Sequence, residues 1–360
     1  MHPQALTPHG AELLARVMTF AQPADAAVAQ YFREHPKLGA RDRHALSDQV
    51  FAHLREQPLP DWLMQRLQAE VGGECSALVD ALKQPAPLDL RVNVLKAKRP
   101  AVLAQLVAQG LDVAPTPYAP MGLRLPGKPA LQREPLYQDG TIEVQDEGSQ
   151  LAVLLSGVQP GWQVLDLCAG AGGKTLALGA AMRNTGRLYA LDTSAHRLDG
   201  LQPRLQRSGL QQVVTMALAH EDDDRLQRLR GKVDRVLVDA PCSGLGTLRR
   251  SPDLKWRQTP QTIAELSALQ ARILASAAKL LKPGGRLVYA TCSLLREENE
   301  DVAAAFARSH REFRALDAGE PLRRQSVSHP ETLCQDGYLR LWPQHHQTDG
   351  FFAAVWERGA

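Results

Sequence analysis

Apolar runs and helical segments alternate through the second half of this chain, and this alternation constrains the fold more than any other feature. Helices that separate strands carry the chain back, so that the strands run parallel in one sheet. We expect an α/β fold with a mostly parallel, doubly wound sheet, whose ligands bind beyond the carboxyl ends of its strands. The expected strands are 163–167, 187–191, 213–217, 233–238 and 285–290, and the expected helices are 174–182, 195–207 and 260–281.

A glycine-rich turn follows the first of these strands. Gly170, Gly172 and Gly173 fall within four positions, and glycine lets a backbone turn sharply and approach a ligand closely. The turn is not a phosphate-binding P-loop, which would need glycine at the position of Cys168. Asp192 ends the next strand, where a carboxylate is placed to bind ribose hydroxyls. The pattern therefore favours a nucleoside-type cofactor.

Two further strands deliver cysteines to the same edge of the sheet. One strand leads into Asp239 and Cys242, and another leads into Cys292. A thiolate adds readily to an electron-poor carbon, and C5 of cytosine becomes carbanion-like only after a nucleophile adds at C6. Asp239 is placed to protonate the N3 edge of such a ring. A methyl donor, a thiolate and an acid together favour methylation of a pyrimidine carbon.

The residues before this region divide into two parts. Apolar residues recur every three or four positions, which predicts a helical region over 1–84. Prolines then interrupt the chain, and a strand at 88–95, a helix at 102–107 and a strand at 122–125 predict a small α+β module over 85–140. Residues 141–360 would form the catalytic domain.

Basic residues cluster on the module and again after Cys242. Clustered positive charge fits a phosphate backbone, even though the net charge of the chain is only +3. Lysines also shield exposed strand edges, which is the competing interpretation. The predicted RNA-binding surface comprises Arg91, Lys96, Lys98, Arg99, Arg249, Arg250 and Lys255.

Composition argues against several other classes. No apolar run approaches the roughly 20 residues of a membrane helix, and the N-terminus has no secretory signal pattern. The five cysteines include no Cys-x-x-Cys pair, which argues against a zinc site or a disulfide framework. We expect a cytoplasmic, monomeric protein that binds no metal and no membrane.

These motifs together resemble the RNA (cytosine-5) methyltransferases of the RsmB (Fmu, Nop/Sun, NSUN) family. The resemblance implies a Rossmann-like class I methyltransferase domain, preceded by the RNA-binding module and by helices that resemble a reduced NusB-like domain. Ala171 stands where the family usually has proline, and Ala219 where it usually has an acid near the adenine. The matching segments are 90–93, 144–150, 165–175, 239–244, 249–256, 289–293, 297–299 and 348–352.

The resemblance also implies roles for single residues. Cys292 would be the nucleophile and Cys242 would assist product release, with Asp239 and Lys174 completing the catalytic group. The implied reaction transfers a methyl group from S-adenosylmethionine to C5 of a cytosine in RNA, with ribosomal RNA as the expected substrate. The implied cofactor-binding residues are Cys168, Ala169, Gly170, Ala171, Gly172, Gly173, Lys174, Asp192 and Asp239.

Two alternatives stay open at this point. One is a transfer-RNA methyltransferase with the same chemistry, and the other is a ribosome-assembly factor that binds RNA without turnover. The presence of Cys292, Cys242, Asp239 and Lys174 argues against the assembly factor. The alanine at position 219, after the strand at 213–217, argues for it. A DNA cytosine methyltransferase is disfavoured, because that family attacks with its Pro-Cys thiol and needs no counterpart of Cys292.

Overall fold

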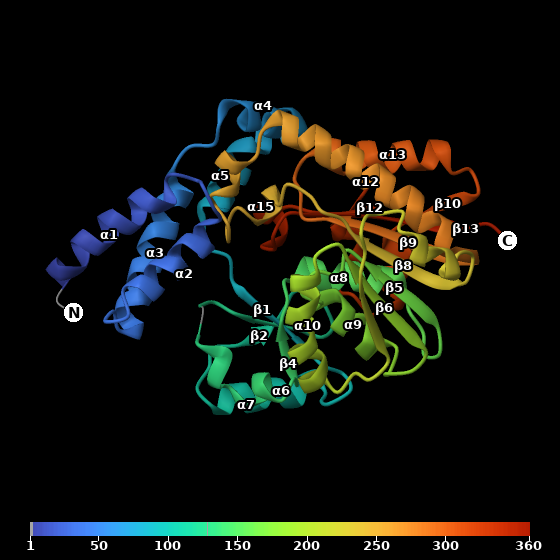
Figure 1. Ribbon diagram of the computed structural model, residues 1–360, viewed down its shortest axis with the longest axis horizontal. Helices are drawn as coiled ribbons and strands as arrows, with labels where there is room; N and C mark the ends of the chain where they lie inside the picture. Colours follow the sequence, from blue (N-terminus) through green and yellow to red (C-terminus); the bar gives the residue numbers. More distant parts are fainter. Residues whose placement is uncertain (1–2, 128) are drawn as a thin grey trace.

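Figure 1 shows the computed structural model, which describes residues 3–127 and 129–360. Within these residues, nine strands form the main sheet, in the order β11-β12-β13-β9-β8-β5-β6-β7, with β10 paired to β13. Strands β5 to β9 are parallel, and the others join antiparallel. The predicted α/β fold with a doubly wound sheet is confirmed. The bounds are β5 Gln163–Leu167, β6 Arg187–Asp192, β7 Val213–Ala217, β8 Val233–Asp239, β9 Leu281–Thr291, β10 Phe313–Leu316, β11 Cys334–Gln335, β12 Tyr338–Leu341 and β13 Phe351–Arg358.

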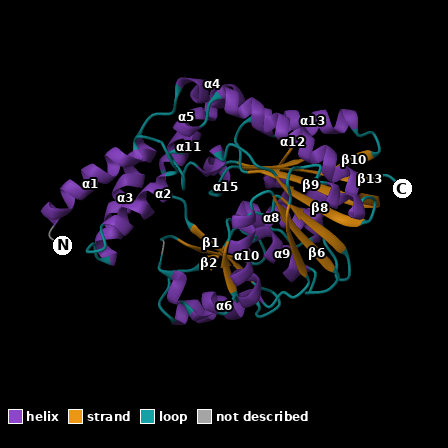
Figure 2. Ribbon diagram, in the orientation of Figure 1, coloured by secondary structure: helices purple, strands orange, loops and turns teal. Residues whose placement is uncertain are grey.

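Helices cover both faces of this sheet, because its strands direct apolar side chains alternately to the two sides. Leu165 packs in the core under α12 and α13, whereas its neighbour Val164 packs in the core under α8, α9 and α14. Figure 2 shows the strands between these two helical layers. The helix bounds are α8 Glu147–Ser156, α9 Gly173–Ala181, α10 Ala195–Ser208, α11 Leu254–Arg257, α12 Pro260–Leu280, α13 Glu300–Ser309, α14 Gly319–Arg324 and α15 Pro343–His346.

The small module has a sheet of its own. Its described strands are antiparallel, in the order β2-β3-β1-β4. Strand β4 lies beyond residue 140, so this sheet continues past the predicted end of the module. Leu90, Val92 and Leu123 pack with Val102 and Leu106 in a separate core. The bounds are β1 Leu88–Val92, α6 Arg99–Ala108, β2 Ala114–Pro115, β3 Gly122–Leu125, α7 Pro135–Gln138 and β4 Ile142–Val144.

Strand β1 ends earlier than the alternating pattern predicts. The expected strand covered 88–95, but the side chain of Asn93 accepts a hydrogen bond from the N–H of Leu95 at 3.1 Å, and its carbonyl accepts one from Lys96 at 3.0 Å. This local turn competes with the sheet for backbone hydrogen bonds. The lysines that follow therefore lie in a loop, and Arg99 begins α6.

The N-terminal helices belong to two packing groups. Helices α1 (Pro3–Val17), α2 (Ala24–Glu34) and α3 (Ala40–Glu56) share a core of their own. Helices α4 (Asp61–Val71) and α5 (Cys75–Lys83) instead pack against Leu245, Leu294 and Trp342 of the main domain. Figure 1 shows α1, α2 and α3 beside one another, with α4 and α5 close to α12.

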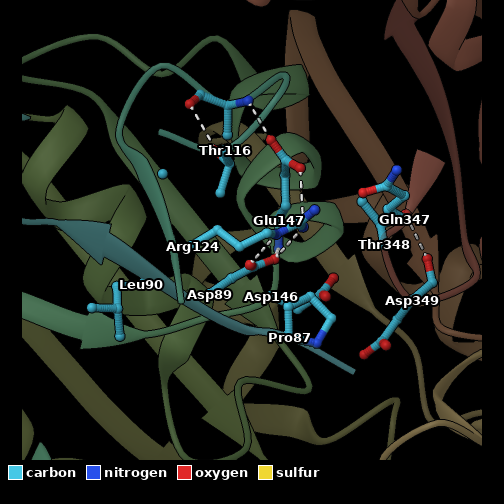
Figure 3. A network of polar contacts seen from close by, with 12 residues as sticks. Pro87, Asp89, Leu90, Thr116, Arg124, Asp146, Glu147, Gln347, Thr348 and Asp349 are labelled. Atoms are coloured by element: carbon cyan, nitrogen blue, oxygen red, sulfur yellow. Dashed lines mark hydrogen bonds and ion pairs between the residues drawn. The ribbon is translucent and has the colours of Figure 1, made fainter. Parts of the chain in front are cut away.

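Buried charges join the small sheet to the main domain. Arg124 on β3 donates to both carboxylate oxygens of Asp89 on β1, at 2.7 and 2.8 Å. The same guanidinium lies 3.4 Å from Glu147 at the start of α8, and Figure 3 shows the three side chains together. Breaking a buried pair costs roughly 3–5 kcal/mol, so this contact fixes the small sheet against α8.

No helix within the described parts of the chain is both long and apolar enough to cross a membrane.

Candidate active site

The glycine-rich turn is held in a left-handed conformation between β5 and α9. Residues Cys168, Gly170 and Gly172 have φ values of 68°, 55° and 83°. A Cβ atom on Gly172 would lie 2.1 Å from the side chain of Leu201, so only glycine fits there. The backbone N–H of Gly170 donates to Asp192 Oδ2 at 2.7 Å, which ties the turn to the end of β6.

Asp192 has the position and the free acceptor capacity that ribose binding needs. Its side chain is buried, and its Oδ1 accepts a hydrogen bond from the N–H of Ser194 at 2.8 Å. Each oxygen of an ionised carboxylate can accept two hydrogen bonds, so each retains one acceptor site. Asp192 lines a cavity of about 420 Å³ at the carboxyl ends of the strands.

The cavity has an apolar wall and a second acid that the sequence analysis did not select. Leu218, Leu269 and Ile273 supply the apolar wall, and Glu221 lies in the lining after β7. The hydrogen bond from Arg272, at 2.5 Å, lowers the pKa of Glu221. Ala219 takes the place of the usual acid, so the nearest carboxylate in the lining comes two residues later. The carboxylate of Asp192, an apolar wall and a second carboxylate fit a nucleoside with an adenine base.

Lys174 and Asp239 form an ion pair beside this cavity. The Nζ atom of Lys174 lies 2.6 Å from Asp239 Oδ2 and 3.3 Å from Ser149 Oγ. Burial alone would lower the pKa of Lys174, but the neighbouring carboxylate outweighs burial and the pKa is raised. The lysine thus stays charged, and it carries this charge between the glycine-rich turn and the end of β8.

The two predicted cysteines meet at the same edge. Cys242 Sγ and Cys292 Sγ lie 3.5 Å apart, and both line the cavity. The hydrogen bond with Cys292 and burial raise the pKa of Cys242, with a smaller contribution from the charge of Glu298. Burial also raises the pKa of Cys168, so that thiol keeps its proton at neutral pH. The chain therefore presents one thiol pair to the cofactor cavity.

Three of the predicted RNA-binding residues lie inside the protein. Arg91, Arg249 and Lys255 are 6%, 7% and 2% exposed. Arg249 donates to main-chain carbonyls including that of Thr348, and Lys255 donates to the carbonyl of Gln57 at 2.6 Å. Burial lowers the pKa of Lys255 to about 8. The prediction that these three cations form an exposed basic surface is therefore wrong.

The other predicted RNA-binding residues differ in their exposure and in their hydrogen bonds and ion pairs within the protein. Arg250 binds Asp349 at 2.5 Å and Asp146 at 3.1 Å, and is thus engaged inside the protein. Lys96 and Arg99 donate to main-chain carbonyls, whereas Lys98 is exposed. The exposed lysines of the predicted surface are thus Lys96, which already donates to the carbonyls of Asp139 and Arg207, and Lys98.

One cluster of the described residues has the spacing of metal ligands. His9, Glu12 and His35 offer ligand atoms within 4.8 Å of one another. Both carboxylate oxygens of Glu12 already accept hydrogen bonds, from Arg16 and from Tyr31. The cluster belongs to the α1–α3 group and not to the cofactor cavity, and the expected absence of a metal stays a prediction.

The glycine-rich turn, the buried carboxylate of Asp192 and the cavity at the carboxyl ends of a doubly wound sheet define a class I methyltransferase that uses S-adenosylmethionine. Residues 152–357 match the family described as 16S rRNA methyltransferase RsmB/F, and residues 59–132 match the RsmF/B-like ferredoxin-like domain. The chain therefore belongs to the RsmB/F methyltransferase family. The predicted family membership and cofactor are confirmed.

Relatives and solved structures agree with this assignment. The chain is 36% identical to the probable ribosomal RNA small subunit methyltransferase B of Synechocystis sp., over 89% of this chain and 72% of that protein. It is 33% identical to the probable protein of the same name from Bacillus subtilis, over 86% and 68% of the two chains. A methyltransferase homolog protein from Pyrococcus horikoshii is similar in structure, with a TM-score of 0.70, 29% identity and coverage of 86% and 97%.

Proposed function

We propose that this enzyme methylates C5 of a cytosine in ribosomal RNA through a covalent bond between Cys292 and C6 of the ring. The observation that carries the proposal is the thiol pair, with sulfur atoms 3.5 Å apart in the lining of the cofactor cavity. An RNA methyltransferase that acted on a ring nitrogen or a ribose hydroxyl would need no thiol at this edge. The names of the relatives support ribosomal RNA as the substrate class.

The chemistry assigns a separate task to each side chain. The Cys292 thiolate adds to C6, and the electron pair displaced from the C5–C6 bond makes C5 nucleophilic. The Lys174–Asp239 pair, whose N–O distance is 2.6 Å, is positioned to supply a proton to the N3 edge. S-adenosylmethionine supplies the electrophilic methyl group. Transfer of the C5 proton to a base at the site, return of the N3 proton to the Lys174–Asp239 pair and cleavage of the C6–S bond then restore the aromatic ring and the thiolate.

Cys242 is assigned to the last step. Its raised pKa keeps it protonated at neutral pH, so it does not compete with Cys292 for C6. Its sulfur is close enough to exchange a proton with the leaving Cys292 thiolate. In this scheme, Cys242 promotes the breakdown of the adduct and not its formation.

The division of the chain is part of the proposal. We assign residues 3–56 to a separate helical unit, 59–145 to the RNA-binding module and 146–360 to the catalytic domain. The separate core of α1–α3 supports the first boundary. The pairing of β4 with β1 supports the second, because it moves the predicted boundary at 140 past Val144.

The test compares Cys292→Ala with Cys242→Ala on small-subunit ribosomal RNA and labelled cofactor. Cys292→Ala should give neither methylated RNA nor adduct. Cys242→Ala should accumulate a nuclease-sensitive protein–RNA band on a denaturing gel, because the adduct forms but breaks down slowly. Cys75→Ala, a change in α5 away from the cavity, is the matched control and should behave as the wild type.

Other outcomes would contradict the assignment. An adduct that formed in Cys292→Ala would make Cys242 the nucleophile. Full activity in both variants would show that the thiols are structural. Tight RNA binding by the wild type without any methyl incorporation would favour an assembly factor, and incorporation only into transfer RNA would change the substrate class.

A further inference from the structure

A single buried carboxylate lies behind both cysteine loops. Glu298 is fully buried at the end of a short 3-10 turn, Arg296–Glu298. Its Oε1 accepts hydrogen bonds from the N–H of Ser243 at 2.8 Å and from Gln270 at 3.1 Å. Its Oε2 accepts hydrogen bonds from the hydroxyls of Ser243 and Ser293, both at 2.5 Å. Ser243 and Ser293 directly follow Cys242 and Cys292 in the sequence.

The four hydrogen bonds fill the acceptor sites of a carboxylate at Glu298. An ionised carboxylate only accepts hydrogen bonds and has about four acceptor sites, and here each oxygen receives two. An amide would replace one of these two accepting oxygens with an NH2 group, which cannot accept hydrogen bonds. No ion pair to Glu298 occurs among the described residues, so hydrogen bonds from the two cysteine loops provide its stabilisation.

The two thiols interact with different charged groups. The anion of Glu298 contributes to the raised pKa of Cys242. The cation of Lys174 interacts instead with Cys292, since a charge on Cys292 raises the pKa of Lys174. The charge of Glu298 therefore acts against a thiolate at Cys242, and the charge of Lys174 attracts a thiolate at Cys292.

We propose that Glu298 is a positioning residue that holds the two cysteine loops in register and selects Cys292 as the thiol that carries the charge. This inference rests on the proposed function, since it explains why one of two adjacent thiols acts as the nucleophile. Glu298 does not line the cofactor cavity, and among the described residues its side chain makes no hydrogen bond to either sulfur. It acts through Ser243 and Ser293.

The experiment measures thiol reactivity without RNA. The full-length enzyme is treated with iodoacetamide from pH 6 to 9, and alkylation of Cys242 and Cys292 is followed separately by peptide mass spectrometry. In the wild type, Cys292 should react at least tenfold faster than Cys242 at pH 7.5. In Glu298→Gln, the profile of Cys242 should move to lower pH and the preference should shrink to a few-fold. A purely structural role would not move this profile.

Two further variants separate charge from position. Glu298→Asp keeps the charge, so the preference for Cys292 should persist, but the shorter side chain cannot reach both serines and kcat should fall at least tenfold. Ser293→Ala removes a single donor and should give a milder loss of kcat, with KM for RNA unchanged. This variant keeps the inference testable if Glu298→Gln does not fold. An equal preference in the wild type and both glutamate variants would overturn it.

The outcomes also distinguish the two proposals. If the wild type forms no adduct with RNA but Glu298→Gln still loses its thiol preference, then the proposed function fails and the role of Glu298 stands. If the wild type forms the adduct at Cys292 but the thiol preference does not depend on Glu298, then the inference fails alone.

Discussion

Asp166 offers a quantitative test of how the buried site is built. It is fully buried on β5, under the glycine-rich turn, and its Oδ1 has no hydrogen-bond partner among the described residues. Its Oδ2 accepts a hydrogen bond from the hydroxyl of Thr175 at 2.6 Å. Burial raises the pKa of Asp166 to about 7, because the hydrogen bond from Thr175 offsets only part of the desolvation.

The sign of the effect on stability follows from the direction of this shift. The unfolded carboxyl has a pKa of about 3.9, so above about pH 4 the unfolded chain releases a proton that the folded chain keeps. The free energy of unfolding therefore decreases as the pH rises from about 4 to about 7. Asp166→Asn removes this titration while keeping the size of the side chain. Over the two pH units from 5 to 7, at up to about 1.36 kcal/mol each, the variant should gain about 2 kcal/mol relative to the wild type.

Urea unfolding of both proteins, at half-unit steps from pH 5 to pH 8.5, measures this difference. The difference between the two free energies should grow up to about pH 7 and then stay constant. Thr175→Val removes the hydrogen bond that lowers the pKa, so its decline in stability should continue to higher pH than in the wild type. A difference that stays constant from pH 5 to pH 8.5 would refute the buried, protonated state of Asp166.

Two more predictions follow from the site. Asp192→Ala should weaken S-adenosylmethionine binding by roughly 2–3 kcal/mol, the range for hydrogen bonds to a charged group; calorimetry that found unchanged affinity would remove Asp192 from the cofactor site. Lys98→Ala should reduce the slope of log RNA affinity against log salt by roughly 0.7 to 0.9, whereas Lys255→Ala should leave the slope unchanged because that ammonium is buried. Equal effects of the two changes, in filter-binding titrations, would contradict the exposure of these residues.

The parallel strands and the cysteine pair were predictable from the sequence because each rests on a local pattern. A buried strand such as Val236–Val238 is recognised by its continuous apolar residues, and the residue after it must emerge at the carboxyl edge of the sheet. Parallel strands place all such residues on one edge. Cys242 and Cys292 could therefore be brought together without knowledge of any side-chain contact.

The burial and the hydrogen-bond partners of the charged residues were not predictable in this way. Arg249 and Lys255 lie in a stretch of sequence rich in basic residues, which is typical of an exposed basic patch. Inside the protein, however, their side chains donate hydrogen bonds to main-chain carbonyls of distant segments. The residues next to Arg249 and Lys255 in the sequence do not indicate such distant partners. The same holds for Glu298, whose donors lie 55, 28 and 5 positions away. Glu221 was missed because it lies in a loop four residues after the end of β7 at Ala217, where no local pattern indicates that it faces the cavity.

The separate core of α1, α2 and α3 has a consequence for how the protein unfolds. This unit meets the rest of the chain at α5 and at residues 249–256. There Trp256 stacks on Phe20, with ring centroids 4.8 Å apart, and Asp253 accepts a hydrogen bond from the N–H of Ala24 at 3.1 Å. Units with their own core open with their own free energy. Heating should thus unfold the three helices as one cooperative unit, in a transition separate from that of the catalytic domain. A single midpoint temperature fitted to the whole protein would then describe neither transition.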